Sequence, residues 1–145
     1  MKLKAWLFIG SILFPVSGVP GESVNKHYSS VGIGFQYAIA GVKFGLEGDI
    51  NNYYGSVGPG AYAAGVERPV SPSGKITIGA VVGGFLIIPY GAVNINYHLN
   101  GYRNKGWVLG VDAGGFFNPF YHENTENDEA KRIYSLVFVN LGYKF

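Results

Sequence analysis

The amino-acid sequence predicts an all-β protein, a closed antiparallel up-and-down transmembrane β-barrel of about eight strands. The 145-residue chain contains 23 glycines, 11 tyrosines, 10 phenylalanines and 2 tryptophans but only 14% charged residues, far from ordinary globular usage. Several segments alternate apolar and polar residues with the period of two that is typical of β-strands. Beyond the first twenty residues no run of 18 apolar residues occurs, so any membrane span must consist of strands.

The clearest strand is the last stretch, residues 132–145, with the sequence RIYSLVFVNLGYKF. Its odd positions are apolar or aromatic with one exception, Ser135: Ile133, Ser135, Val137, Val139, Leu141, Tyr143 and Phe145. Its even positions end polar or small, at Asn140, Gly142 and Lys144. One continuous apolar face and one face that becomes polar are what a barrel with lipid outside and a polar lumen inside requires.

The end of this strand, with Leu141, Tyr143 and the final Phe145, resembles the terminal strand of the small eight-stranded bacterial outer-membrane barrels. The resemblance implies that these three residues are the signal read by the barrel assembly machinery. It also implies a location in the outer membrane of a Gram-negative-type bacterium, with outer-membrane lipid as a partner.

The first 18 residues are predicted to be a signal peptide. Lys2 and Lys4 precede an apolar run, residues 5–16, that is too short to span a bilayer as a helix. We place cleavage after Gly18, treat residues 19–28 as a polar lead-in, and assign residues 29–145 to the barrel. The alternative, in which the apolar run is a strand of the fold, stays open.

The barrel region predicts a series of strands joined by turns. Alternation over residues 29–39, a tight turn at Ala40-Gly41 and a mirrored strand over residues 42–50 come first. We read residues 51–60 as a turn. Further strands are expected over residues 61–68, 76–88, 93–99 and 107–114, with connections at 69–75 and 100–106.

This interpretation contains seven strands, whereas bacterial barrels have an even number. Three explanations are open: residues 19–28 pair weakly, residues 51–68 or 76–88 contain a further strand, or the leader is itself a strand. If the long loop after residue 117 lies outside, the connections near 40–41, 69–75 and 100–106 face the periplasm. Two aromatic girdles then follow. The first contains Tyr37, Tyr97, Trp107, Tyr143 and Phe145, and the second contains Tyr53, Tyr54, Tyr90, Phe117, Phe120 and Tyr121.

The polar residues that alternate with the apolar ones are predicted to face the lumen. This polar network comprises Lys43, Glu47, Asp49, Glu67, Asn94, Asn96, His98, Asp112, Asn140 and Lys144. An eight-stranded barrel is just wide enough for side chains to fill it, so we expect a hydrogen-bonded and ion-paired interior. A conducting, porin-like lumen or a ligand-holding one is the alternative.

We expect a structural or surface-interaction role in the cell envelope, without catalysis and without a cofactor. His27, His98 and His122 lie too far apart in sequence for metal-ligand spacing. Without the two leader lysines, nine basic residues balance nine acidic ones, so no basic patch suggests nucleic acid. The acidic loop 118–131 could bind cations or a surface partner, although a solvated loop needs neither.

Two other function classes are kept as alternatives. Small outer-membrane deacylases that trim lipid A carry a His followed two residues later by Ser, whereas here His98 is followed by Leu99 and Asn100. The second alternative is a soluble periplasmic barrel that encloses a small ligand, which would require the apolar faces to point inward.

Overall fold

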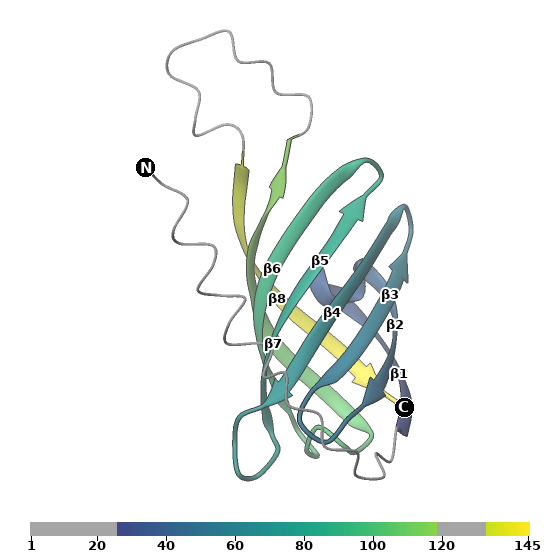
Figure 1. The fold of residues 1–145 in the computed structure, drawn as a ribbon, viewed down its shortest axis with the longest axis vertical. Helices are drawn as coiled ribbons and strands as arrows, with labels where there is room; N and C mark the ends of the chain where they lie inside the picture. Colours follow the sequence, from purple (N-terminus) through teal and green to yellow (C-terminus); the bar gives the residue numbers. More distant parts are fainter. Residues whose placement is uncertain (1–25, 119–132) are drawn as a thin grey trace, which may run out of the picture.

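The computed structural model describes residues 26–118 and 133–145, and eight antiparallel strands of this part close into a barrel (Figure 1). The strands are β1 (Lys26–Gly34), β2 (Ile39–Glu47), β3 (Asn52–Gly58), β4 (Ala61–Pro69), β5 (Ile76–Phe85), β6 (Ile88–His98), β7 (Gly106–Phe117) and β8 (Ile133–Lys144). Each strand pairs with its neighbours in sequence, and β1 closes the barrel on β8 from Ser30↔Lys144 to Ile33↔Leu141. The predicted all-β, eight-stranded, up-and-down fold is confirmed.

We call the end where β1 begins and β8 ends the proximal end, and the opposite end the distal end. The connections 48–51, 70–75 and 99–105 lie at the proximal end, while 35–38, 59–60 and 86–87 lie at the distal end. The long connection between β7 and β8 also leaves from the distal end. As predicted, the connections 70–75 and 99–105 lie at the end opposite the β7–β8 connection, whereas the first connection does not.

The strand missing from the sequence interpretation is β3, which we had read as a turn. Asn52, Tyr54 and Ser56 point into the barrel while Tyr53 and Val57 point out, and the strand pairs with both β2 and β4. Only residues 59–60 remain as the turn, with Gly60 at φ +70°. Because this turn is short, the preceding seven residues form a strand. Its Asn, Gly and Ser residues are uncommon in strands, which is why the sequence suggested a turn.

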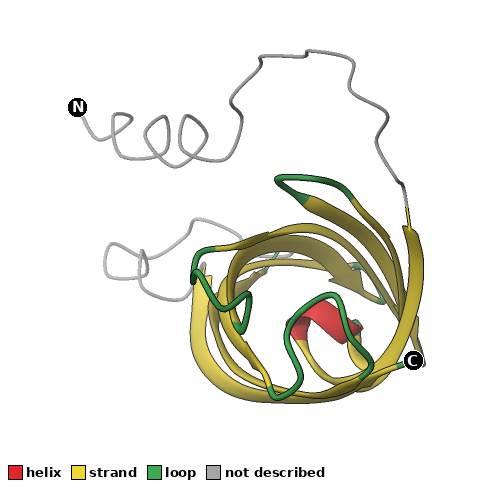
Figure 2. Cartoon of the chain, turned by 90° about the horizontal axis from the view of Figure 1, so that it is seen from below, coloured by secondary structure: helices red, strands yellow, loops and turns green. Residues whose placement is uncertain are grey.

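The first connection also differs from the prediction. β1 stops at Gly34, residues Phe35–Tyr37 form a 3-10 turn, η1, and the chain reverses through Ala38 and Ile39, both at positive φ. The expected turn at Ala40-Gly41 is therefore wrong, and the real connection lies at the distal end. Figure 2 shows η1 in red inside the ring of strands. Phe35 and Tyr37 share the parity of Ile33 in the sequence, so alternation alone could not reveal that the chain folds inward.

The two faces of the wall have opposite chemistry. Asn96 is completely buried inside the barrel, whereas the adjacent Ile95 is 60% exposed on its outer surface. The same alternation holds for Glu47 against Phe44 and for Asp112 against Leu109. Each of the eight strands contributes large exposed apolar residues, so the outer wall is an apolar surface closed around the barrel.

Exposed aromatic side chains gather at both margins of this wall. At the proximal end they are Tyr53, Tyr97, Trp107 and Phe145, and at the distal end Tyr62, Phe85, Phe117 and Tyr134. The predicted girdles need correction at four positions. Tyr37, Tyr54 and Tyr90 are buried inside the barrel, and Tyr53 lies at the proximal margin. Phe120 and Tyr121 lie outside the described residues.

On the inner wall, tyrosine rings lie over glycines of the neighbouring strand. Tyr28 is paired with Gly45, Tyr54 with Gly65, and Tyr90 with Gly83. A Cβ at Gly83 would come within 2.6 Å of the Tyr90 ring, and one at Gly65 would overlap the Tyr54 phenol. The glycines therefore provide the space in which large rings fill a narrow barrel.

We predict that Gly65→Ala lowers the free energy of unfolding by about 1–3 kcal/mol, because the added methyl group overpacks the interior against Tyr54. Gly55→Ala is the matched control, because a Cβ there faces outward and meets nothing closer than 3.9 Å. The control should be neutral or slightly stabilising. Urea-induced unfolding of the folded barrel in detergent measures both, and equal effects at the two positions would contradict the ring-over-glycine packing.

Candidate functional site in the barrel interior

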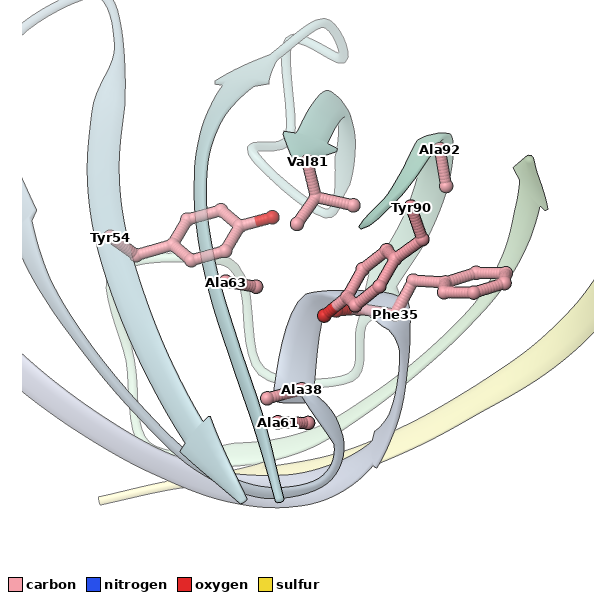
Figure 3. Packing of buried hydrophobic residues seen from close by; sticks show 8 residues of the cluster. All are labelled: Phe35, Ala38, Tyr54, Ala61, Ala63, Val81, Tyr90 and Ala92. Atoms are coloured by element: carbon pink, nitrogen blue, oxygen red, sulfur yellow. The ribbon is translucent and has the colours of Figure 1, made fainter. Parts of the chain in front are cut away.

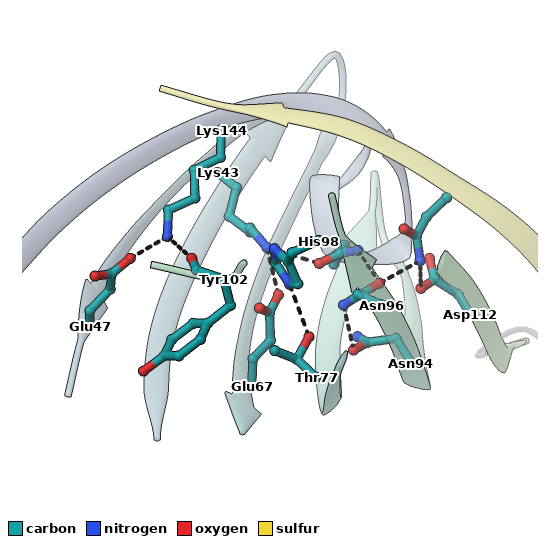
Figure 4. A network of polar contacts seen from close by, with 12 residues as sticks. Lys43, Glu47, Glu67, Thr77, Asn94, Asn96, His98, Tyr102, Asp112 and Lys144 are labelled. Carbon is teal, nitrogen blue, oxygen red and sulfur yellow. Dashed lines mark hydrogen bonds and ion pairs between the residues drawn. The ribbon is translucent and has the colours of Figure 1, made fainter. Parts of the chain in front are cut away.

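The barrel interior has a polar layer and an apolar layer. Buried polar side chains occupy its proximal and middle parts (Figure 4), and an apolar cluster occupies its distal part (Figure 3). The polar layer contains Ser30, Gln36, Lys43, Glu47, Asn52, Ser56, Glu67, Thr77, Asn94, Asn96, His98, Asp112, Asn140 and Lys144. Burying so many polar groups is tolerable only where they satisfy one another.

Lys43 on β2 is the centre of the polar layer. Its ammonium forms an ion pair with Glu67 of β4 at 2.6 Å and donates a hydrogen bond to Gln36 Oε1 at 2.8 Å. The rings of Tyr54, Tyr37 and Tyr28 surround it, with centroids 4.6, 5.1 and 5.8 Å away. The carboxylate and the three ring faces together compensate the ammonium for the water it has lost.

A second ion pair joins Lys144, at the end of β8, to Glu47, at the end of β2. Lys144 also donates a hydrogen bond to the backbone carbonyl of Tyr102, in the connection 99–105. The Tyr28 ring lies 4.4 Å from the Lys144 ammonium as well as near Lys43. Tyr102 is also buried, so this ion pair links β2 and β8 to the connection 99–105 at the proximal end of the interior.

An amide and carboxylate chain connects β6, β7 and β8. Asn140 donates through Nδ2 to Asn96 Oδ1 at 3.0 Å and to Asp112 Oδ1 at 2.7 Å. Asn96 in turn donates to Asn94 Oδ1 at 3.2 Å. These bonds fix three successive strands to one another from inside the barrel.

The same chain holds η1 in place. Asp112 Oδ2 accepts a hydrogen bond from the backbone N–H of Phe35 at 2.7 Å, and Asn96 Oδ1 accepts one from Gln36 Nε2 at 2.9 Å. Tyr90 donates its hydroxyl proton to the Phe35 carbonyl at 3.1 Å. With the Lys43 contact to Gln36, η1 is tied to β2, β6 and β7, so it forms an internal plug.

The apolar layer lies on the distal side of this plug. The Phe35 ring packs against Tyr90, Phe116 and Phe138, with centroids 5.2, 5.5 and 6.4 Å away. Small residues complete the cluster: Ala38, Ala61, Ala63, Val81 and Ala92 (Figure 3). The plug thus presents polar atoms to the polar layer and an aromatic ring to the distal opening.

Of the ten residues predicted for the lumen network, the structure places nine inside the barrel and brings them into connected contacts. The exception is Asp49. β2 ends at Glu47, and Asp49 lies exposed in the turn 48–51, which is closed by the Gly48 N–H bonding to the Asn51 carbonyl. Asp49 therefore takes no part in the interior network, whereas Glu47 pairs with Lys144.

Sequence reasoning missed much of the interior. Gln36 and Tyr37 were assigned to a strand, Asn52 and Ser56 to a turn, and Tyr28 to the lead-in. Thr77, which is hydrogen-bonded to His98 Nε2 at 3.2 Å, was placed in the expected strand 76–88 but not among the residues of the polar network. The alternation of Asn52, Tyr54 and Ser56 was a usable signal, whereas nothing in the sequence marks the inward fold of η1.

The remaining predicted sites are placed in part. Leu141, Tyr143 and Phe145 lie at the proximal end of the outer face, where the Phe145 N–H bonds to the Ser29 carbonyl. Residues 1–18, 19–25 and 119–131 lie outside the described residues. His98 is buried at the proximal end of β6, whereas Ser135 is exposed near the start of β8 at the other end, so the two cannot act together.

The polar layer leaves a small cavity of about 10 Å³, lined by residues that include Tyr28, Lys43, Glu67, His98 and Lys144. That volume is comparable with a single water molecule. The fold and the interior of the described residues define a closed eight-stranded β-barrel with an apolar outer wall and a filled, ion-paired core.

Comparisons with known proteins add no further assignment, since no family model, no curated protein and no solved structure matches this chain. Within the described residues, no helix has the length and apolar character needed to cross a membrane. No group of three or more His, Asp or Glu side chains in that part of the chain is arranged to hold a metal ion.

We predict that Lys43→Met destabilises the barrel by about 3–5 kcal/mol, because it leaves the Glu67 carboxylate buried without its partner. The double variant K43M/E67Q removes both charges and should recover much of the loss. Lys26→Met, at an exposed position, is the control and should change stability by less than about 0.5 kcal/mol. Urea unfolding measures all three. A double variant no more stable than K43M would show that the charge pair is not the cause.

Proposed function

We propose that this chain is an integral membrane β-barrel of the cell envelope, in the outer membrane of a Gram-negative-type bacterium, with a structural or surface-interaction role and no catalysis. The observation that carries the proposal is the sidedness of the wall. All four ion-paired side chains, Lys43, Glu67, Lys144 and Glu47, are inside, while the outer face is apolar on every strand. In water this arrangement would expose far more apolar surface than soluble proteins tolerate.

Two features support the membrane assignment independently. The strands contain 7 to 12 residues, which brackets the 9–11 that a tilted membrane-spanning strand needs. Aromatic side chains mark both margins of the apolar wall, as they do where barrels meet the lipid headgroups. The leader-like segment 1–18 and the terminal Phe145 agree with export and outer-membrane assembly.

The filled interior favours a structural role over a porin-like one. The plug η1 is hydrogen-bonded to Asp112 and Asn96 inside the barrel, and at the proximal end the buried Tyr102 is bonded to Lys144. His98 is engaged with Thr77 and lies beside the Tyr102 ring. This leaves it inside the wall, away from any lipid substrate on the outer surface. The apolar outer face is likewise the opposite of what a soluble ligand-enclosing barrel requires.

Fractionation of cells that express the chain tests the membrane assignment. We expect the protein in the membrane fraction, released by detergent but not by high salt, and migrating faster on a gel before boiling than after. A folded lipid-facing barrel stays compact until heated, and this produces the shift. Recovery in the soluble fraction without detergent would overturn the proposal and favour the soluble-barrel alternative.

Reconstitution into a planar bilayer tests the structural role. We expect no stable single-channel steps in concentrated KCl, because the plug and the ion pairs occupy the lumen. The variant D112A, which removes an acceptor for both Phe35 and Asn140, should increase current fluctuations by loosening η1. Steady conductance by the unmodified protein would instead support the porin-like alternative.

A further inference from the structure

The described surface is strongly asymmetric in charge. At the proximal end the unburied charged side chains include Lys26, Arg68, Lys75, Arg103 and Lys105, and Asp49 is the single unburied acid among the described residues. The described distal connections, 35–38, 59–60 and 86–87, contain no charged residue. Within the described residues, the proximal end is therefore basic, while the described distal connections carry no charge.

Four of these basic residues gather over β4 to β7, and we call them the basic rim: Arg68, Lys75, Arg103 and Lys105. Their two connections are held together by backbone hydrogen bonds from Tyr102 N–H to the Gly74 carbonyl at 2.8 Å and from His98 N–H to the Lys75 carbonyl at 2.7 Å. Neither connection contains an acidic residue. Clustered like charges repel one another, and an anionic partner beside them would relieve that repulsion.

The basic rim is also free to bind. Arg68, Lys75 and Lys105 form no ion pair with any described residue. Arg103 is oriented by a hydrogen bond from Nε to the Tyr102 hydroxyl at 2.8 Å and by stacking on that ring at 5.5 Å. Trp107, 51% exposed, lies two residues from Lys105, within the proximal aromatic margin. Cationic groups directly beyond an aromatic margin are placed at the depth of lipid phosphates.

From this geometry we infer that the basic rim binds the phosphate headgroups of anionic phospholipids in the leaflet at the proximal end. The inference rests on the proposed membrane location and adds to it the lipid class and the end of the barrel that recognises it. Basic residues near a membrane surface attract anionic lipid within about a Debye length, so the preference should weaken as salt is raised.

Fluorescence quenching at Trp107 tests the inference directly. In a Trp6→Phe background Trp107 is the single tryptophan, so acyl-brominated lipids report which lipid lies beside the rim. The barrel is reconstituted in vesicles of phosphatidylcholine and phosphatidylglycerol, with one or the other brominated. We expect phosphatidylglycerol to be preferred by roughly threefold to tenfold at low salt, which corresponds to about one effective unit charge acting at the membrane surface.

The variant R68Q/K75Q/K105Q should abolish this preference, and the matched control R68K/K75R/K105R, which conserves charge, should retain it. If the glutamine variant does not fold, K75Q and K105Q singly should each reduce the preference. Equal quenching by the two lipids, or a preference that survives neutralisation, overturns the inference while leaving the membrane proposal intact. Absence of quenching by either lipid would instead contradict the membrane proposal itself.

Discussion

The ion pair between Lys43 and Glu67 is the interaction on which the interior depends. An ammonium inside a protein is stable only when a carboxylate, hydrogen-bond acceptors or ring faces replace its lost water. Lys43 obtains these from β4, from η1 and from three tyrosines of different elements. The charge of Lys43 is therefore compensated only when the strands and η1 are both in their native positions. This couples the closure of the sheet to the position of η1.

Barrel size explains why the interior has to be built in this way. Eight strands leave a lumen that side chains can just fill, so the size of each inward side chain must fit the space left by its neighbours. Cross-strand pairs of tyrosine and glycine meet this need, since each large ring lies over a residue without a side chain. The plug takes up the remaining space at the distal side, where Phe35 completes the apolar cluster. The polar layer lies on the proximal side of η1 and the apolar layer on its distal side.

The sequence was sufficient for the fold and for the direction of most side chains, because a period of two reports the face of a strand directly. The prediction from sequence failed where the chain leaves a strand while the alternation of apolar and polar residues continues. Phe35 and Tyr37 continue the apolar alternation of Ile33 although they belong to the plug. Asp49 continues the polar alternation of Glu47 although β2 has ended. β3 was missed for the opposite reason, since Asn and Gly in residues 51–60 resemble a turn while the strand pairs on both sides.

Partnerships within the site could not be read from the sequence in the same way. Lys144 and Glu47 are 97 positions apart, and Phe35 and Asp112 are 77 apart, so only the closed sheet brings them together. Alternation identified Lys43, Glu47 and Asp112 as inward-facing but gave no means of pairing them. Tyr102 was not identified because it lies in a connection, where alternation says nothing about which side chains turn inward. Thr77 was not identified because it is a single polar residue in a largely apolar strand.

A filled barrel with an apolar wall has little capacity for recognition along its length. Its buried charged side chains are paired with one another inside the barrel, and its outer face offers mainly dispersion contacts. Specific contacts must therefore come from the two margins. At the proximal margin the described residues combine tyrosine, tryptophan and basic side chains, whereas the described distal connections contain no charged residue and one of them, 86–87, consists of exposed Leu86 and Ile87. This difference in margin chemistry gives the barrel two chemically distinct ends, although its apolar wall has the same character on every strand.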